Sequence, residues 1–156
     1  MGHERFASSL ASAGISGCIL PDLPLEELDI WSESAANSKI ETILLAAPTT
    51  PDERLLQICA RSAGFVYAVG LLGVTGMRSE LADSATEIAS RLKNVTSKPV
   101  LVGVGIGSPE QAVEACKVSD GVIVGSAIVQ EMINGSSPEE VGELVSTFRD
   151  ALDKNC

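Results

Sequence analysis

A glycine and a serine, Gly125-Ser126, interrupt the apolar run GVIVGSAIVQ at residues 121–130. The residues before this pair are typical of a buried strand, and those after it have the spacing of a helix. Backbone N–H groups at a helix start have no partner within the helix and carry the positive end of its dipole, so a glycine there lets an anion approach. The pattern indicates a phosphate site. The alternative is that Ser126 only caps the helix and Gly125 only relieves a tight turn.

The elements that would position this pair alternate along the chain. Apolar runs typical of buried strands lie at 17–23, 42–48, 65–71, 100–106 and 121–127. Helices are predicted at 51–63, 81–93, 108–118 and 137–154. In all but 81–93, a Ser or Thr cap precedes a proline at the first helical position and acids in the first turn. Strand followed by helix predicts right-handed βαβ units, which form either a doubly wound sheet or part of a (β/α)8 barrel.

Glycines after the last two apolar runs distinguish these architectures. A dinucleotide-binding sheet has G-x-G-x-x-G after its first strand and an acid about 20 residues later. Here Gly103-Val104-Gly105-Ile106-Gly107-Ser108 follows the fourth run, and the next run ends in Gly125-Ser126 without an acid. Two successive strands that end in glycines match the phosphate site of many barrels. We therefore predict an α/β fold that is a partial (β/α)8 TIM barrel, with about five parallel strands and flanking helices.

Composition excludes several classes of function. The 156 residues are 45% hydrophobic and carry a net charge of −10, which suits a single globular domain over 1–156 and argues against nucleic acid as a partner. No run approaches the eighteen apolar residues of a membrane span, so no membrane partner and a cytoplasmic location are expected. The four cysteines are widely spaced, without a metal-binding pattern, and are expected to be free thiols. His3 is expected to be solvated.

Four motifs, in this order and spacing, resemble the second half of the tryptophan synthase alpha chain. They are GISGCILPDLPLEE at 14–27, FVYAVGLLGVTGMR at 65–78, VLVGVGIGSPEQA at 100–112 and GVIVGSAIV at 121–129. The resemblance implies a (β/α)8 barrel that cleaves indole-3-glycerol phosphate to indole and glyceraldehyde 3-phosphate in tryptophan biosynthesis. It implies a beta chain as partner, which receives the indole and carries pyridoxal phosphate, and no cofactor or metal in this chain.

The resemblance also assigns roles to individual residues. Phosphate-binding positions match Gly76, Gly105, Gly125 and Ser126. Thr75 matches the threonine of a mobile loop that closes over the substrate, so the loop at 71–80 is expected to move more than its flanks. Tyr67 matches a tyrosine that lines the indole pocket, and Asp22 an aspartate near the beta-chain interface. From the residues alone, Tyr67 could be a core aromatic, Thr75-Gly76 an ordinary turn, and Asp22 a helix cap or turn residue before Pro24.

The acid and base needed for retro-aldol cleavage have no counterpart in this sequence. The family supplies a glutamate at the end of strand 2 and an aspartate in the loop after it, and both would lie before Met1. The only acids near a strand end are Asp22 and Glu26. The five apolar runs then correspond to strands 4 to 8, and the chain is expected to lack the first three βα units and to be inactive alone.

Three functions remain open at this stage. The first is a fragment of a tryptophan synthase alpha subunit, a lyase that works when the absent strands are supplied. The second is a non-catalytic half barrel that binds a phosphorylated ligand or another subunit, and the third is another sugar-phosphate barrel enzyme. In each case an open sheet edge favours self-association.

Overall fold

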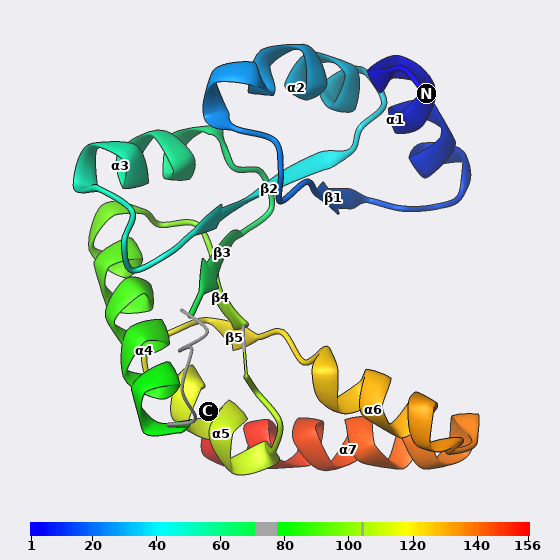
Figure 1. Ribbon diagram of the computed structural model, residues 1–156, viewed down its shortest axis with the longest axis vertical. Coiled ribbons are helices and arrows are strands. Elements are labelled where there is room, and N and C mark those ends of the chain that lie inside the picture. Colours follow the sequence, from blue (N-terminus) through cyan, green and yellow to red (C-terminus); the bar gives the residue numbers. More distant parts are fainter. Residues whose placement is uncertain (71–77, 104) are drawn as a thin grey trace.

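The computed structural model describes residues 1–70, 78–103 and 105–156 (Figure 1). Within these ranges one sheet of parallel strands has the order β1-β2-β3-β4-β5. The strands are β1 (Gly17–Ile19), β2 (Glu41–Ala46), β3 (Val66–Val69), β4 (Val100–Gly103) and β5 (Gly121–Val122). Strands that follow one another in sequence are neighbours in space, as in a barrel wall, whereas a doubly wound sheet reverses its strand order. The predicted strand runs and fold class are confirmed, although each strand is shorter than its apolar run.

Helices follow the strands in the predicted order. They are α1 (His3–Ser12), α2 (Leu28–Asn37) after the 3-10 turn η1 (Leu25–Glu27), α3 (Asp52–Arg61), α4 (Arg78–Val95), α5 (Pro109–Cys116), α6 (Ser126–Asn134) and α7 (Pro138–Asn155). Helix α1 was not predicted because it lacks a start signal: its N-cap is Gly2, which makes no side-chain cap hydrogen bond. His3 is exposed, as expected, but its ring also packs edge-on against Trp31, with centroids 6.5 Å apart.

The predicted helix caps are correct for two helices and wrong for one. Ser108 and Ser137 each form a capping box, in which the serine and the residue three positions later exchange hydrogen bonds. Helix α3, in contrast, begins one residue later than predicted, with Pro51 as its N-cap. Thr50 does not cap it, because its Oγ1 accepts a hydrogen bond from the Ala47 N–H at 3.0 Å and closes the preceding turn instead.

The two faces of the sheet differ in burial. On β3 and β4 one face carries Val66, Ala68, Val100 and Val102, all at most 1% exposed. This face packs against the helices, whose largest buried side chains are Leu28, Trp31, Leu55, Ile88 and Leu92. Burial of each such side chain contributes about 1.5–3 kcal/mol, so this layer dominates stability. The alternate residues of the strands, among them Leu45, Tyr67, Val69 and Leu101, are only half-buried.

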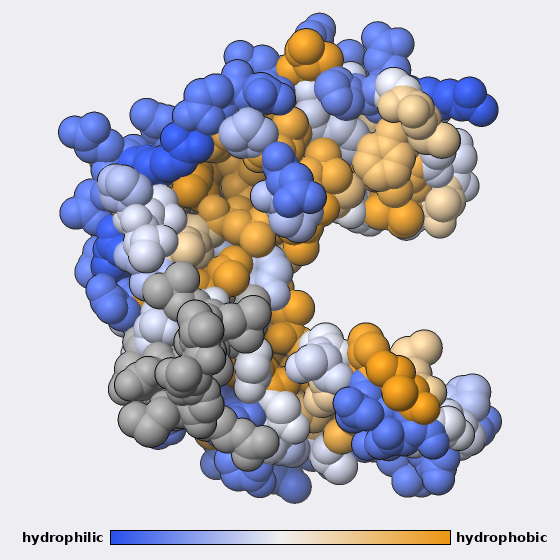
Figure 2. Space-filling model, in the orientation of Figure 1, coloured by the Kyte–Doolittle hydropathy of each residue, from blue (hydrophilic) through white to orange (hydrophobic). Residues whose placement is uncertain are grey.

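The sheet and its helices form a C-shaped molecule with the helices on its outer side (Figure 1). Figure 2 shows hydrophobic residues along the inner side of the C and a second group over α6. On α6, Val129, Met132 and Ile133 are 51%, 63% and 73% exposed. The accessible surface is 9307 Å², whereas a compact protein of 16.2 kDa has about 7,500 Å². The accessible surface of the chain is therefore about 1,900 Å² larger than that of a compact protein of the same mass.

Basic side chains hold neighbouring βα units together. Lys98, just before β4, donates to the carbonyls of Cys59 and Ser62 at the end of α3, at 2.7 and 2.6 Å. Arg91 of α4 donates to Pro48 O and Thr50 O in the loop after β2, at 2.8 and 2.7 Å. Across the described ranges, none of the helices combines the length and apolarity that a membrane crossing requires.

Candidate functional site at the carboxyl ends of the strands

The Tyr67 side chain of β3 reaches Gly103, the last residue of β4. The strands pair in parallel, with Tyr67 beside Leu101 and Val69 beside Gly103. A Cβ placed on Gly103 would lie 2.6 Å from Tyr67 Cζ, so the tyrosine ring occupies the space that a side chain at position 103 would need. Burial raises the pKa of the Tyr67 hydroxyl. The ring lies on the half-buried face, away from Val66 and Ala68, so Tyr67 is not part of the helix-covered core.

Gly103 was not among the predicted site residues. A glycine inside a strand pattern signals a bulge or a close approach by another group, and this signal is present in the sequence. Local pattern alone does not say which group approaches. The structure identifies it as Tyr67, which lies 36 residues earlier in the chain on the neighbouring strand.

The loop after β4 contains Gly105 and leads into α5. Gly105 is exposed and has a φ of +79°, a conformation that favours glycine, so here the backbone itself explains the residue. The start of α5 is already occupied by its own side chains. Gln111 Oε1 accepts from the N–H groups of Gly107 and Ser108 at 2.7 and 3.2 Å, and Ser108 Oγ accepts from Gln111 N. An anion would have to displace Gln111 to reach these amides.

The start of α6 differs from those of α5 and α7. Its N-cap is Gly125, with a φ of −119°, and no side chain caps it. The expectation that Ser126 caps the helix is therefore wrong, because Ser126 is the first helical residue. The expectation that Gly125 relieves a tight turn also has no support, since its φ is negative and a Cβ there would meet no atom within 4 Å. Neither folding geometry nor packing explains the glycine.

The predicted phosphate residues come from adjacent strands. Gly105 follows β4 and Gly125 follows β5, and these strands pair in parallel through Leu101–Gly121 and Val102–Val122. Both loops therefore leave the same edge of the sheet, and Gly105, Gly125 and Ser126 are all exposed there. Thr75, Gly76 and most of the loop at 71–80 lie outside the described residues, so their predicted roles stay predictions.

Asp22 lies in an exposed turn three residues after β1, where Leu23 N donates to Leu20 O at 3.2 Å. The turn interpretation is confirmed, and the cap interpretation is wrong because the N-cap of η1 is Pro24 and no side chain forms a cap hydrogen bond there. Nearby, Glu26 forms a two-bond ion pair with Arg54 of α3, at 2.6 and 3.1 Å. The hydrogen bond from Arg54 lowers the pKa of Glu26 to about 2, so this acid is committed to a structural contact.

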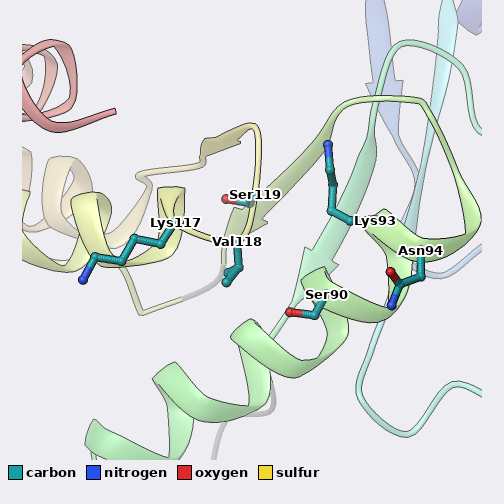
Figure 3. A pocket seen from close by; sticks show the side chains of 6 residues that line it. All are labelled: Ser90, Lys93, Asn94, Lys117, Val118 and Ser119. Carbon is teal, nitrogen blue, oxygen red and sulfur yellow. The ribbon is translucent and has the colours of Figure 1, made fainter.

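A cavity of about 390 Å³ lies elsewhere, between the end of α4 and the turn after α5 (Figure 3). It is lined by Ser90, Lys93, Asn94, Lys117, Val118 and Ser119. Lys93 is paired with Asp120 at 2.7 Å and Lys117 with Glu114 at 2.5 Å, and in Figure 3 the two lysines point in different directions. Asp120 also accepts from Val100 N, at the amino end of β4. The cavity is therefore at the sheet edge opposite the glycine loops.

Comparison with known proteins decides the family. The family model described as "Tryptophan synthase alpha chain" matches residues 1–154. The chain belongs to the tryptophan synthase alpha chain family. The tryptophan synthase alpha chain of Streptomyces avermitilis is 42% identical over 153 residues, and that of Gloeobacter violaceus 44% over 150 residues. Membership of this family decides against another sugar-phosphate barrel family.

Solved structures of tryptophan synthase superpose on this alpha-chain family member and support the same assignment. A chain of Mycobacterium tuberculosis tryptophan synthase superposes with a TM-score of 0.85 and 37% identity, covering 97% of this chain and 57% of that one. A chain of the Pyrococcus furiosus α2β2 complex gives a TM-score of 0.82 at 34% identity, covering 97% and 61%. The Streptomyces and Gloeobacter matches cover 98% and 96% of this chain but 55% and 54% of theirs. The chain thus spans about half the length of the relatives it matches.

Proposed function

We propose that this chain supplies the phosphate-binding half of a tryptophan synthase alpha subunit, which cleaves indole-3-glycerol phosphate to indole and glyceraldehyde 3-phosphate. The observation that carries the proposal is the uncapped start of α6 at Gly125, where no backbone strain or contact requires a glycine. The amides at the start of α6 would bind the phosphate, with Gly105 approaching from the neighbouring loop. Gly76 and Thr75 would join from the loop at 71–80.

Tyr67 is proposed to contact the indole ring. It lies on the half-buried face of the sheet, and its ring reaches Gly103 at the carboxyl end of β4, the edge from which the loops of Gly105 and Gly125 also leave. Its position is set by Gly103, which leaves room for the ring. A substrate bound with its phosphate at Gly125 would extend along this edge toward Tyr67.

Cleavage also requires a proton donor and acceptor, which this chain alone is proposed not to supply. Phosphate contacts hold substrate and transition state about equally, so they strengthen binding without lowering the chemical barrier. A positioned acid or base contributes about 10² to 10⁴ in rate. Glu26 is held by Arg54, and Asp22 is exposed in its turn. We therefore expect near-background turnover unless the remaining part of the barrel is present.

The partners proposed for the assembled subunit are the beta chain, which would carry the pyridoxal phosphate, and the substrate and product themselves. A cytoplasmic location is proposed with them.

The half-buried inner sheet face and the additional 1,900 Å² of exposed surface also favour a second candidate role, in subunit interaction or self-association without catalysis. Such an area corresponds to a large interface if another half barrel covers it.

Indole release from indole-3-glycerol phosphate tests the proposal. We expect no release by the purified chain, and release after addition of a chain that carries barrel strands 1 to 3. Release by the chain alone that Asp22→Asn abolishes would make Asp22 catalytic and overturn the proposed division of roles. Phosphate binding without any release in the combined sample would favour the non-catalytic role.

A further inference from the structure

Helix α6 carries an apolar face that is open to solvent. Val129, Met132 and Ile133 are 51%, 63% and 73% exposed, and their spacing of three and four residues places them on one side of the helix. The helix packs against α7, yet none of its nine residues is buried. Helices this short gain most of their stability from packing rather than from propensity. The exposed face of α6 is therefore available to a partner.

The surface around this face is uncharged. Glu131 is the only charged residue of α6; it is partly buried and accepts a hydrogen bond from Ser136 Oγ at 2.7 Å. The exposed amides of Gln130 and Asn134 bond to each other at 3.0 Å. An apolar centre with neutral polar neighbours suits contact between proteins. An anionic membrane does not suit it, because α6 has no Lys or Arg.

The hollow of the C-shaped molecule is the second part of this surface. Half-buried residues of the inner sheet face, among them Leu45, Tyr67 and Leu101, bound it, and Figure 2 shows hydrophobic residues along it. Helix α6 lies on the side of α7 that faces the hollow (Figure 1). One chain thus presents an apolar helix and, beside it, an apolar concave face. Two copies hooked into each other would each place α6 in the hollow of the other.

We propose that this surface binds a second copy of the chain, in a dimer whose two α6 helices pack against each other about a two-fold axis. The same residues of both copies then make the contact, and the two-fold symmetry ends the assembly at two copies. The area is sufficient. If each copy covers half of its additional 1,900 Å², about 1,900 Å² is buried in total, which is the size of a stable interface.

The dimer rests on the second candidate role proposed above and names its partner. It also excludes the first role while it lasts, because a second α6 in the hollow would cover Tyr67, the residue proposed to contact the indole ring. A chain that carries barrel strands 1 to 3 would need the same hollow. The dimer and the assembled barrel therefore compete for one surface, and the supply of the other strands decides between them.

Sedimentation velocity of the whole chain, without phosphate, tests the dimer. We expect twice the mass of 16.2 kDa at about 10 μM, because interfaces of this size bind with micromolar or tighter affinity. Ile133→Lys should raise the dissociation constant about a hundredfold or more, since it places a charge in the contact twice. The variant should fold, because the side chain is exposed and a lysine suits the last turn of a helix.

Ile30→Lys is the matched control. Ile30 is 67% exposed on α2, which lies on the outer side of the C, so this variant should dimerise as the wild type does. Hydrogen exchange gives a second readout: the α6 amides should become more protected with rising concentration in the wild type and in Ile30→Lys, but not in Ile133→Lys. Position 133 is about two turns from Gly125, so Ile133→Lys should keep the phosphate response, and the two proposals can fail separately.

Several results would overturn the dimer. These are a monomer at about 100 μM, a dimer that survives Ile133→Lys, or equal loss of the dimer in Ile30→Lys. Assemblies of more than two copies would show that the open sheet edges pair instead. A chain with barrel strands 1 to 3 that binds without separating the two copies would show that the hollow is not part of the contact.

Discussion

Replacement of Gly125 by valine tests the anion site most directly. A side chain at this position meets no protein atom within 4 Å, so it should fit the folded chain but stand where an anion would approach the start of α6. Loss of a helix N-cap glycine costs at most about 1 kcal/mol. Loss of two hydrogen bonds to a charged phosphate, at about 1.5–3 kcal/mol each, weakens binding at least a hundredfold.

Thermal unfolding with increasing phosphate at low ionic strength measures the effect. Phosphate at 100 times its Kd should stabilise the wild-type chain by about 2.7 kcal/mol, which raises the Tm by roughly 5–11 °C for a protein of this size. Gly125→Val should show a nearly unchanged Tm without phosphate and no rise with it. Gly142→Ala is the matched control, because Gly142 is an exposed α7 glycine whose Cβ also meets nothing within 4 Å.

The control should gain about 0.5–1 kcal/mol of stability, because alanine suits a helix interior better than glycine, and should bind phosphate as the wild type does. An unchanged phosphate Kd in Gly125→Val would refute the anion site at the start of α6, since the anion then binds elsewhere. Unfolding of the chain by Gly125→Val would also refute it, because Gly125 would then have a structural role although a Cβ there meets no atom within 4 Å.

Three further perturbations follow from individual contacts. Gly103→Ala places a Cβ against the Tyr67 ring and should cost about 1–3 kcal/mol in urea unfolding, a loss that Tyr67→Ala should largely relieve; an unchanged midpoint contradicts this contact. The Glu26–Arg54 pair should stabilise the chain above the usual pKa of 4.5 and lose this effect as the pH falls toward 2, so Glu26→Gln should flatten acid unfolding there. Trp31, the single tryptophan and fully buried, should emit at short wavelength until unfolding, and Trp31→Phe should cost less than the 3–5 kcal/mol of Trp31→Ala.

The Trp31 prediction has a specific reason. Among the described residues, its indole N–H is the buried side-chain donor without a hydrogen-bond partner. Phenylalanine removes this unsatisfied group while keeping the ring contact with Phe6, whose centroid lies 5.7 Å away. Equal losses for both variants would show that the ring contacts contribute little.

Much of the fold could be predicted from the sequence because its signals are local. Apolar runs separated by helix starts predicted the alternation of strands and helices, and the serines at 108 and 137 predicted the starts of α5 and α7. The same logic failed at Thr50, where a turn amide competed for the hydroxyl, and at α1, which has no capping side chain. A cap is predictable when no amide of the preceding turn competes for its side chain.

The sequence by itself determined the family motifs, the order of the βα units and the two glycine loops after β4 and β5. The tertiary structure decided which of the two helices that follow these loops begins without a side-chain cap. Gln111 closes the start of α5, whereas no side chain closes that of α6. Only the folded chain could place Tyr67 against Gly103, because this contact joins residues that lie 36 positions apart in the sequence. Such contacts depend on how strands and helices pack, and packing is a property of the whole chain that no local pattern encodes.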